Sequence, residues 1–178
     1  MAIVKINYLK RGRGERTGAK ASIRYIQHRT GKAGAKTTRT LFGLDGAMGR
    51  RDAYRMIDEA EKGSLFFRFV LSPDPTQEDT QRDLRLRDVT ETTMQALADH
   101  LHQPVSWVGA VHEDHTPHRH VHIVAVVAGR LTPQAFRSLP QVLRRAATGE
   151  SLTQRRQLDQ VREAQAKERE REEEEWEL

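Results

Sequence analysis

Hydrophobic and polar positions alternate with a period of two in several short stretches, which is the pattern of half-buried strands. Residues 2–9 (AIVKINYL) alternate in this way, and residues 64–73 (SLFFRFVLSP) form an apolar run that ends at a proline. Residues 105–113 and 119–127 are also apolar and flank a short polar turn. These last two stretches are therefore predicted to form a β-hairpin. The two most apolar stretches, at 64–71 and 120–127, are predicted to be the central strands.

Other segments carry helical rather than alternating patterns. Residues 19–29, 51–63 and 76–102 are predicted to be helices, with Thr76 as the N-cap of the third and acidic residues in its first turn. Its predicted buried side carries Leu84, Val89, Met94, Leu97 and Leu101.

The remaining segments show little periodicity or a strong charge bias. Residues 11–18 are predicted to be a basic turn, and residues 30–49, with five glycines, a long loop. Two short helical turns are expected over 132–149. Residues 151–177, almost entirely charged and helix-forming, are expected to form one exposed helix.

This order of elements predicts an α+β fold with a mainly antiparallel sheet and helices against one face. The expected organisation is a core domain at 1–130, a helical extension at 131–150 and a charged, exposed helix at 151–178.

Charge is distributed unevenly along the 178 residues. The formal net charge is +5 and the sequence pI is near 9.8. Residues 1–55 alone carry a net charge of +11, whereas residues 162–178 carry −4. A basic N-terminal region favours an anionic partner, most simply nucleic acid.

Several classes of protein are excluded by what the sequence lacks. There is no cysteine, so disulfides, thiolate metal sites and cysteine nucleophiles are ruled out. The N-terminus does not resemble a signal peptide, and no apolar run is long enough to span a membrane. A cytoplasmic protein without membrane insertion is therefore expected.

Five of the eight histidines lie within the segment HEDHTPHRHVHIV at 112–124. Because side chains alternate along a strand, His120 and His122 point to the same face, and the predicted hairpin would bring His112 beside them. Three neutral imidazoles that leave coordination positions open are typical of a reactive divalent-metal site. The simpler alternative is a histidine-rich hairpin on the surface.

Lysine and arginine are dense between residues 10 and 39, among glycines that let a backbone approach phosphates closely. This segment predicts salt-dependent binding to DNA, although it could also be a solvated basic loop. Aromatic residues are only 6% of the chain, so no broad base-stacking platform is expected. The predicted DNA contacts, including one on the strand at 64–73, are Lys20, Arg24, Arg29, Lys32, Lys36, Arg39 and Arg68.

Three motifs, in this order, resemble the HUH endonucleases, and within them the conjugative relaxases of the MobA type. SIRYIQHRTGK at 22–32 is similar to the family's tyrosine-bearing helix and Gly/Lys loop. FRFVLSPDP at 67–75 is similar to a strand that ends in Ser-Pro-acid. HEDHTPHRHVHIV is similar to the family's histidine signature. The resemblance covers about residues 1–130.

The resemblance implies site-specific and strand-specific nicking and rejoining of single-stranded DNA at a transfer origin. Tyr25 would be the nucleophile, forming a 5′-phosphotyrosine and a free 3′-hydroxyl. His112, His120 and His122 would hold a divalent ion, Mn²⁺ or Mg²⁺. Accessory mobilisation or coupling proteins would be partners. A tyrosine hydroxyl is mostly protonated at pH 7 and needs a nearby cation or base, which flanking arginines and a metal could supply.

Some roles stay open at this stage. His118 could be a proton shuttle, a phosphate contact or a substitute ligand. Asp114 and Asp74 are the candidate carboxylates, and Asp114 could orient a ligand imidazole. Tyr8 and Tyr54 compete with Tyr25, although Tyr8 is predicted to be strand packing.

Three other functions compete with a relaxase. A rolling-circle replication initiator or a single-strand transposase would share the HUH chemistry. A histidine-triad nucleotide hydrolase would use His118, His120 and His122 without metal or tyrosine. A non-enzymatic DNA-binding accessory protein would leave all the histidines inert.

Overall fold

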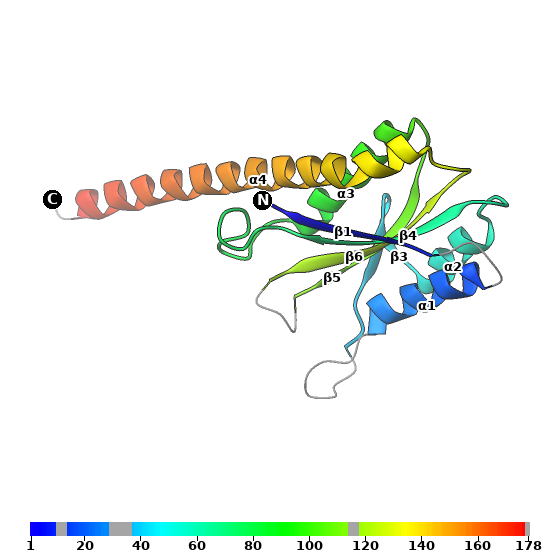
Figure 1. The fold of residues 1–178 in the computed structure, drawn as a ribbon. Coiled ribbons are helices and arrows are strands. Elements are labelled where there is room, and N and C mark those ends of the chain that lie inside the picture. The colour runs from blue at the N-terminus through cyan, green and yellow to red at the C-terminus, as the bar shows by residue number, and fades with distance from the viewer. Residues whose placement is uncertain (10–13, 29–36, 114–117, 177–178) are drawn as a thin grey trace.

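A computed structural model describes residues 1–9, 14–28, 37–113 and 118–176 of the chain, with the side chains of 174–176 left out. The chain is an α+β protein in which six strands and four helices lie within the described residues (Figure 1). The elements in chain order are β1 (Ile3–Tyr8), α1 (Glu15–His28), β2 (Leu41–Gly43), β3 (Gly46–Met48), α2 (Arg50–Asp58), β4 (Leu65–Ser72), α3 (Leu86–Leu101), β5 (Ser106–His112), β6 (His120–Val127) and α4 (Pro133–Trp176).

The strands form one antiparallel sheet in the order β1-β4-β6-β5-β2-β3. The predicted hairpin is confirmed, because β5 pairs directly with β6. Strands β4 and β6, predicted to be central, both lie inside the sheet. Strand β1 is at one edge and pairs only with β4 in the described structure.

Helices cover both faces of the sheet, and the prediction of a single covered face is wrong. Helices α1 and α2 pack on one face, and α3 and the first half of α4 pack on the other (Figure 1). Strand β6 explains the difference, because Val121 and Ile123 are buried on the α3 side while Val124 and Val126 are buried on the α1 side. A strand that is apolar on both faces needs cover on both faces.

Part of the predicted loop at 30–49 is sheet. Strands β2 and β3 make a short hairpin, and β2 pairs with β5. Leu41 and Phe42 are both buried, one on each side of the sheet. Two apolar residues are too short a signal for a strand, so only the long-range pairing with β5 reveals it. At the other predicted turn, residues 15–18 already belong to α1.

The third helix begins at Leu86, ten residues after the predicted N-cap at Thr76. The acidic residues at its expected start are engaged elsewhere. The carboxylate of Glu78 is buried and accepts hydrogen bonds from the backbone N–H groups of Ala2 and Asp74, at 2.9 and 2.8 Å. Thr76 bonds to Asp74 instead of capping a helix. These contacts hold an irregular turn against β1.

Helix α4 is continuous through Pro140, although two short helical turns followed by a separate helix were predicted. Leu139, Leu143 and Ala147 are buried in the same core as β4 and β6. Packing on α3 therefore outweighs the backbone hydrogen bond that the proline removes. The segment 131–150 thus shares its core with residues 1–130.

The exposed part of α4 begins later than predicted. Ser151, Gln154 and Arg155 are buried, and Arg155 and Arg162 both pair with Asp83. From Glu163 to Glu173 every side chain is exposed, and this part of the helix extends away from the sheet (Figure 1). No helix in the described part of the chain has the length and apolar character needed to cross a membrane.

A pair of leucines tests whether the first half of α4 belongs to the core. Replacing the fully buried Leu143 by alanine should lower the free energy of unfolding by about 2–5 kcal/mol, since a cavity is left against α3. Replacing the more exposed Leu152 on the same helix should cost less than about 1 kcal/mol. Denaturant titration measures both values. Equally small losses would show that 131–150 is a detachable extension.

Candidate metal centre

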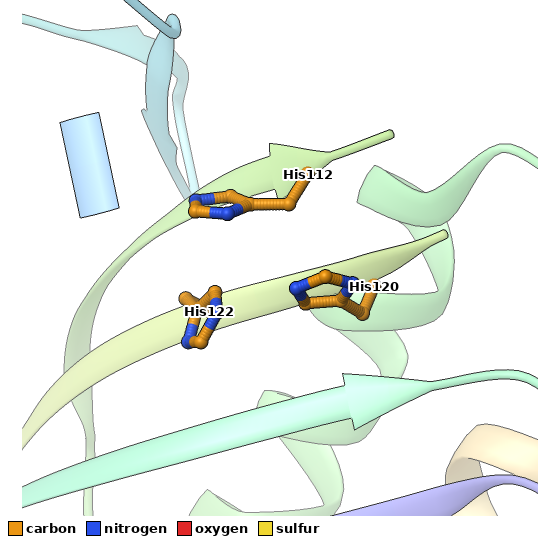
Figure 2. A group of neighbouring side chains, drawn as sticks. All are labelled: His112, His120 and His122. Atoms are coloured by element: carbon orange, nitrogen blue, oxygen red, sulfur yellow. The ribbon is translucent and has the colours of Figure 1, made fainter. Parts of the chain in front are cut away.

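Three histidines converge at one end of the β5–β6 hairpin. His112 ends β5 and is directly opposite His120, the first residue of β6, while His122 is opposite Ala110. All three side chains lie on the α1 side of the sheet, as the alternation predicted. Figure 2 shows their rings converging from the two neighbouring strands. The ring centroids are 4.5–5.3 Å apart.

One nitrogen from each ring can reach a shared cation. A ligand atom from each histidine lies within 4.8 Å of those of the other two. The two strands that carry the histidines, β5 and β6, are interior strands of the sheet, which holds the three rings close together. Three imidazoles suit a divalent transition metal and leave further positions for substrate oxygens. The donor set therefore fits a divalent metal ion that keeps open coordination positions.

Backbone carbonyls orient two of these rings. His112 Nε2 lies 2.9 Å from the carbonyl oxygen of Ile26, and His120 Nδ1 lies 3.1 Å from that of His118. A carbonyl oxygen can only accept, so each of these nitrogens carries the proton. The lone pairs then lie on Nδ1 of His112 and Nε2 of His120. Carbonyl contacts of this kind orient metal-binding imidazoles in proteins.

Helix α1 lies over the histidines and carries the tyrosine predicted to act with them. The ring of Tyr25 meets that of His122 edge-on, with centroids 6.4 Å apart, and Tyr25 is 52% exposed. Ile26, the next residue, is the one that accepts the hydrogen bond from His112. The helix that positions Tyr25 is therefore tied directly to a candidate metal ligand.

The competing tyrosines lie elsewhere. Tyr8 projects from the opposite face of the sheet and packs against Phe67 and Phe136. Tyr54 is on α2, where the ammonium of Lys20 lies 5.6 Å from its ring centroid. Of the three tyrosines in the chain, Tyr25 is the one beside the histidine cluster.

A pocket of about 480 Å³ opens beside Tyr25 and His122. Its floor is formed by β1, β4 and β6, and its wall by α1. Asn7 and Arg68, which are opposite each other on β1 and β4, supply polar groups to the floor. Among the described residues, its lining contains an arginine and no acidic side chain, so the pocket is suited to an anionic group.

The basic residues predicted to contact DNA differ in their exposure and in their ion pairs. Arg68 lines the pocket and Arg24 is exposed on α1. The ammonium of Lys20 lies 2.6 Å from the carboxylate of Asp58, an ion pair that links α1 to α2. Arg39 is buried and so offers little surface to a phosphate. Arg29, Lys32 and Lys36 lie outside the described residues.

The structure does not place the other predicted catalytic groups, His118, Asp114 and Asp74, in the histidine cluster among the residues it describes. His118 is exposed, and its backbone carbonyl contacts His120, but it is not among the three grouped histidines. Asp114 lies outside the described residues, as does His115. Hydrogen bonds from the N-terminal ammonium and from Thr76 lower the pKa of Asp74, whose carboxylate therefore serves the turn after β4.

Two contributions to the site were not predicted. Asn7 joins the pocket, and the carbonyl of Ile26 orients His112. The alternation of β1 already places Asn7 on one face of the sheet. Which residue of β4 lies next to Asn7 depends on the register between the two strands. The Ile26 contact is made by a backbone atom and has no sequence signal.

Comparison with protein-family models, with curated proteins and with solved structures finds no match for this chain. The fold and the site together define an α+β protein with a three-histidine cluster and a neighbouring tyrosine. Any more specific function is a proposal that rests on this geometry.

Proposed function

We propose that this protein is a metal-dependent DNA strand transferase of the HUH type, and more particularly a relaxase that nicks and rejoins single-stranded DNA at a transfer origin. The observation that carries this proposal is the position of Tyr25, half-exposed and edge-on to His122 within the three-histidine cluster. Tyrosine and histidines come from segments almost 100 residues apart in sequence, as the resemblance to relaxases requires.

In the proposed reaction the hydroxyl oxygen of Tyr25 attacks a phosphorus atom of the DNA backbone. The bond between phosphorus and the 3′ oxygen breaks as the bond to Tyr25 forms. The phenolic proton leaves, and the departing 3′ oxygen takes up a proton. The number of phosphoester bonds is unchanged, so the same step in reverse rejoins the strand and needs no further energy source.

The chain's own residues have distinct parts in this reaction. His112, His120 and His122 would hold a divalent cation, Mn²⁺ or Mg²⁺, which when bound polarises the phosphate oxygens. Arg68 on the pocket floor would bind a neighbouring phosphate, since its guanidinium is the cationic group among the described residues that line the pocket. The hydrogen bond between His112 and Ile26 would keep α1, and with it Tyr25, in register with the metal ligands.

A histidine-triad hydrolase is less well supported. It would draw its three histidines from one strand, namely His118, His120 and His122. The structure groups His112 with the other two instead, across the hairpin. A replication initiator or a transposase would use the same chemistry on a different DNA, and only the substrate sequence separates these from a relaxase.

Covalent capture of DNA tests the proposal. The protein is incubated with Mn²⁺ and a pool of single-stranded oligonucleotides of random sequence that carry a fluorophore at the 3′ end. A labelled protein band that survives denaturing electrophoresis is expected, because the 3′ portion of the strand stays attached to tyrosine. A label at the 5′ end should instead be released. Sequencing of the captured strands identifies the preferred nick site.

The matched variants are Tyr25→Phe and Tyr54→Phe. The first should abolish the adduct and the second should retain it, because only the first removes the hydroxyl beside the histidines. An adduct that survives in Tyr25→Phe and disappears in Tyr54→Phe would move the nucleophile to α2. No adduct from any oligonucleotide in the pool would count against strand transfer altogether.

A further inference from the structure

A second surface lies on the opposite side of the sheet from the histidines. Here Tyr8 of β1 and Phe136 of α4 are 48% and 39% exposed, although both are large aromatic residues. Their rings meet edge-on with centroids 5.8 Å apart, and Phe67 lies beneath them in the core. A groove of about 530 Å³ runs along these rings, and Arg130 and Arg137 also line it. We call this feature the aromatic groove.

A basic pocket adjoins the aromatic groove along α4. It has a volume of about 750 Å³, shares Arg137 with the groove and is also lined by Arg144 and Arg145. In the described part of the chain, no acidic side chain is among the residues that line either space. The sequence explains this, because there is no Asp or Glu between Asp114 and Glu150.

The four arginines have no ion-pair partner among the residues that the structure describes. Arg130, Arg137, Arg144 and Arg145 are all exposed, and none takes part in a salt bridge there. Further along the same helix, Arg155 and Arg162 pair with Asp83 and Asp159. These four arginines thus keep their positive charge available for a partner, whereas the charges of Arg155 and Arg162 are neutralised within the protein.

Exposed aromatic rings beside a line of arginines fit single-stranded nucleic acid. Bases can stack on the rings in any sequence, and the arginines can bind the phosphates that link them. An acidic protein segment would satisfy the charges, but it would give no reason for two half-exposed aromatic rings at the centre of the basic surface. The chemistry of the groove therefore favours a nucleic-acid strand.

The aromatic groove and the pocket beside Tyr25 meet at the same end of β1. Asn7 faces the pocket, and its neighbour Tyr8 faces the groove. Strand β1 is the edge of the sheet, so no further strand separates the two faces there. With strands about 4.8 Å apart and residues about 3.4 Å apart along them, Tyr8 lies roughly 14 Å from the position of His122 in the sheet. A flexible single strand of nucleic acid can therefore pass around the β1 edge of the sheet, from one face to the other.

We infer that the aromatic groove and the adjoining arginines of α4 form a second binding surface for single-stranded DNA, which holds the strand that extends from the candidate nicking site. This inference deepens the proposed function and rests on it for the identity of the strand. Binding by the groove itself does not depend on cleavage, so the two can fail separately.

Binding to a fluorescent oligothymidylate, long enough to cover both surfaces, tests the inference. Fluorescence anisotropy is measured without divalent metal, so that no covalent step contributes. Phe136→Leu keeps the apolar bulk and removes the ring, and it should weaken binding about ten-fold. Arg137→Gln should weaken binding and make the slope of log affinity against log salt shallower by about 0.7. Circular dichroism confirms that each variant is folded.

Arg156→Gln is the matched control, because Arg156 is exposed on the same helix outside both spaces. Its affinity and salt slope should equal those of the unaltered protein. Unchanged binding in both Phe136→Leu and Arg137→Gln would overturn the inference. If those variants instead lost affinity for a polyglutamate peptide, the groove would be a protein-binding surface. A covalent adduct at Tyr25 together with unchanged oligothymidylate binding would leave the proposed function intact while refuting this surface.

Discussion

Replacing His122 by alanine should lower the affinity of the protein for Mn²⁺ by more than about 100-fold. Loss of a ligand should exceed the 10- to 100-fold cost of losing an outer-shell partner of a metal site. His122 is the most suitable position for this test, because it lies within β6 and is only partly buried. His112 is 3% exposed and hydrogen-bonded to α1, so its replacement would also disturb packing.

Calorimetric titration with Mn²⁺ measures the affinity, and thermal unfolding gives an independent readout. Metal at 100 times its dissociation constant should raise the melting temperature of the unaltered protein by roughly 5–10 °C, because only the folded hairpin brings the three ligands together. The increase should vanish in His122→Ala and in His120→Ala.

Two further histidines serve as controls. His100 bonds to Ser138 of α4, away from the cluster, so His100→Ala should bind Mn²⁺ normally. His118→Ala should also retain binding, because the structure groups the other three histidines without it. A loss in His118→Ala as large as that in His122→Ala would contradict the assignment of the three ligands.

Replacing Asp79 by alanine should lower the free energy of unfolding by about 3–5 kcal/mol, because the largely buried guanidinium of Arg119 would lose its buried partner and keep only the exposed carboxylate of Glu113. Asp79 is 4% exposed and accepts hydrogen bonds from Arg119 and from the backbone N–H of Leu84. The side chain of Arg119 is 12% exposed, so its guanidinium would keep little water in compensation.

This ion pair also bears on the candidate metal centre. Arg119 directly precedes His120, and its guanidinium reaches away from the histidines to Asp79 and to the carbonyl of Leu84. The pair therefore anchors the start of β6 to the turn before α3. We expect Asp79→Ala to loosen the hairpin end that carries His120.

An exposed ion pair in the same region provides the control. Nε of Arg85 lies 2.9 Å from Oδ2 of Asp88, and the two side chains are 71% and 44% exposed. Asp88→Ala should cost less than about 1 kcal/mol, because water and salt already screen the pair. Denaturant titration compares the two variants, and similar losses in both would show that the Asp79–Arg119 pair is not an anchor.

The histidine cluster could be predicted because its information is local. His120 and His122 share a face through the alternation of one strand, and His112 joins them because the two strands, which are close in sequence, pair as a hairpin. The position of Tyr25 beside the histidines, by contrast, was implied only by a resemblance. It depends on the packing of α1 over β6, which no local pattern encodes.

Helix α4 shows where local patterns mislead. Pro140 and the change from apolar to charged residues both indicate an interrupted element, yet the helix is continuous. The apolar side chains at Leu139, Leu143 and Ala147 recur at helical spacing, but their partners on α3 lie about 50 residues earlier in the chain. Their burial is a tertiary effect.

By itself, the sequence determined the elements whose signals lie within one strand, one helix or one tight hairpin. These include the two inner strands, the face that carries the histidines and the strong basic character of the N-terminal region. The tertiary structure alone decided that both faces of the sheet are covered, that Tyr25 and Asn7 meet His122 at one pocket, and that Tyr8 and Phe136 form a groove on the other face. The physical reason is that strand alternation fixes which way a side chain points, whereas what it meets depends on the register and packing of segments far away in the chain.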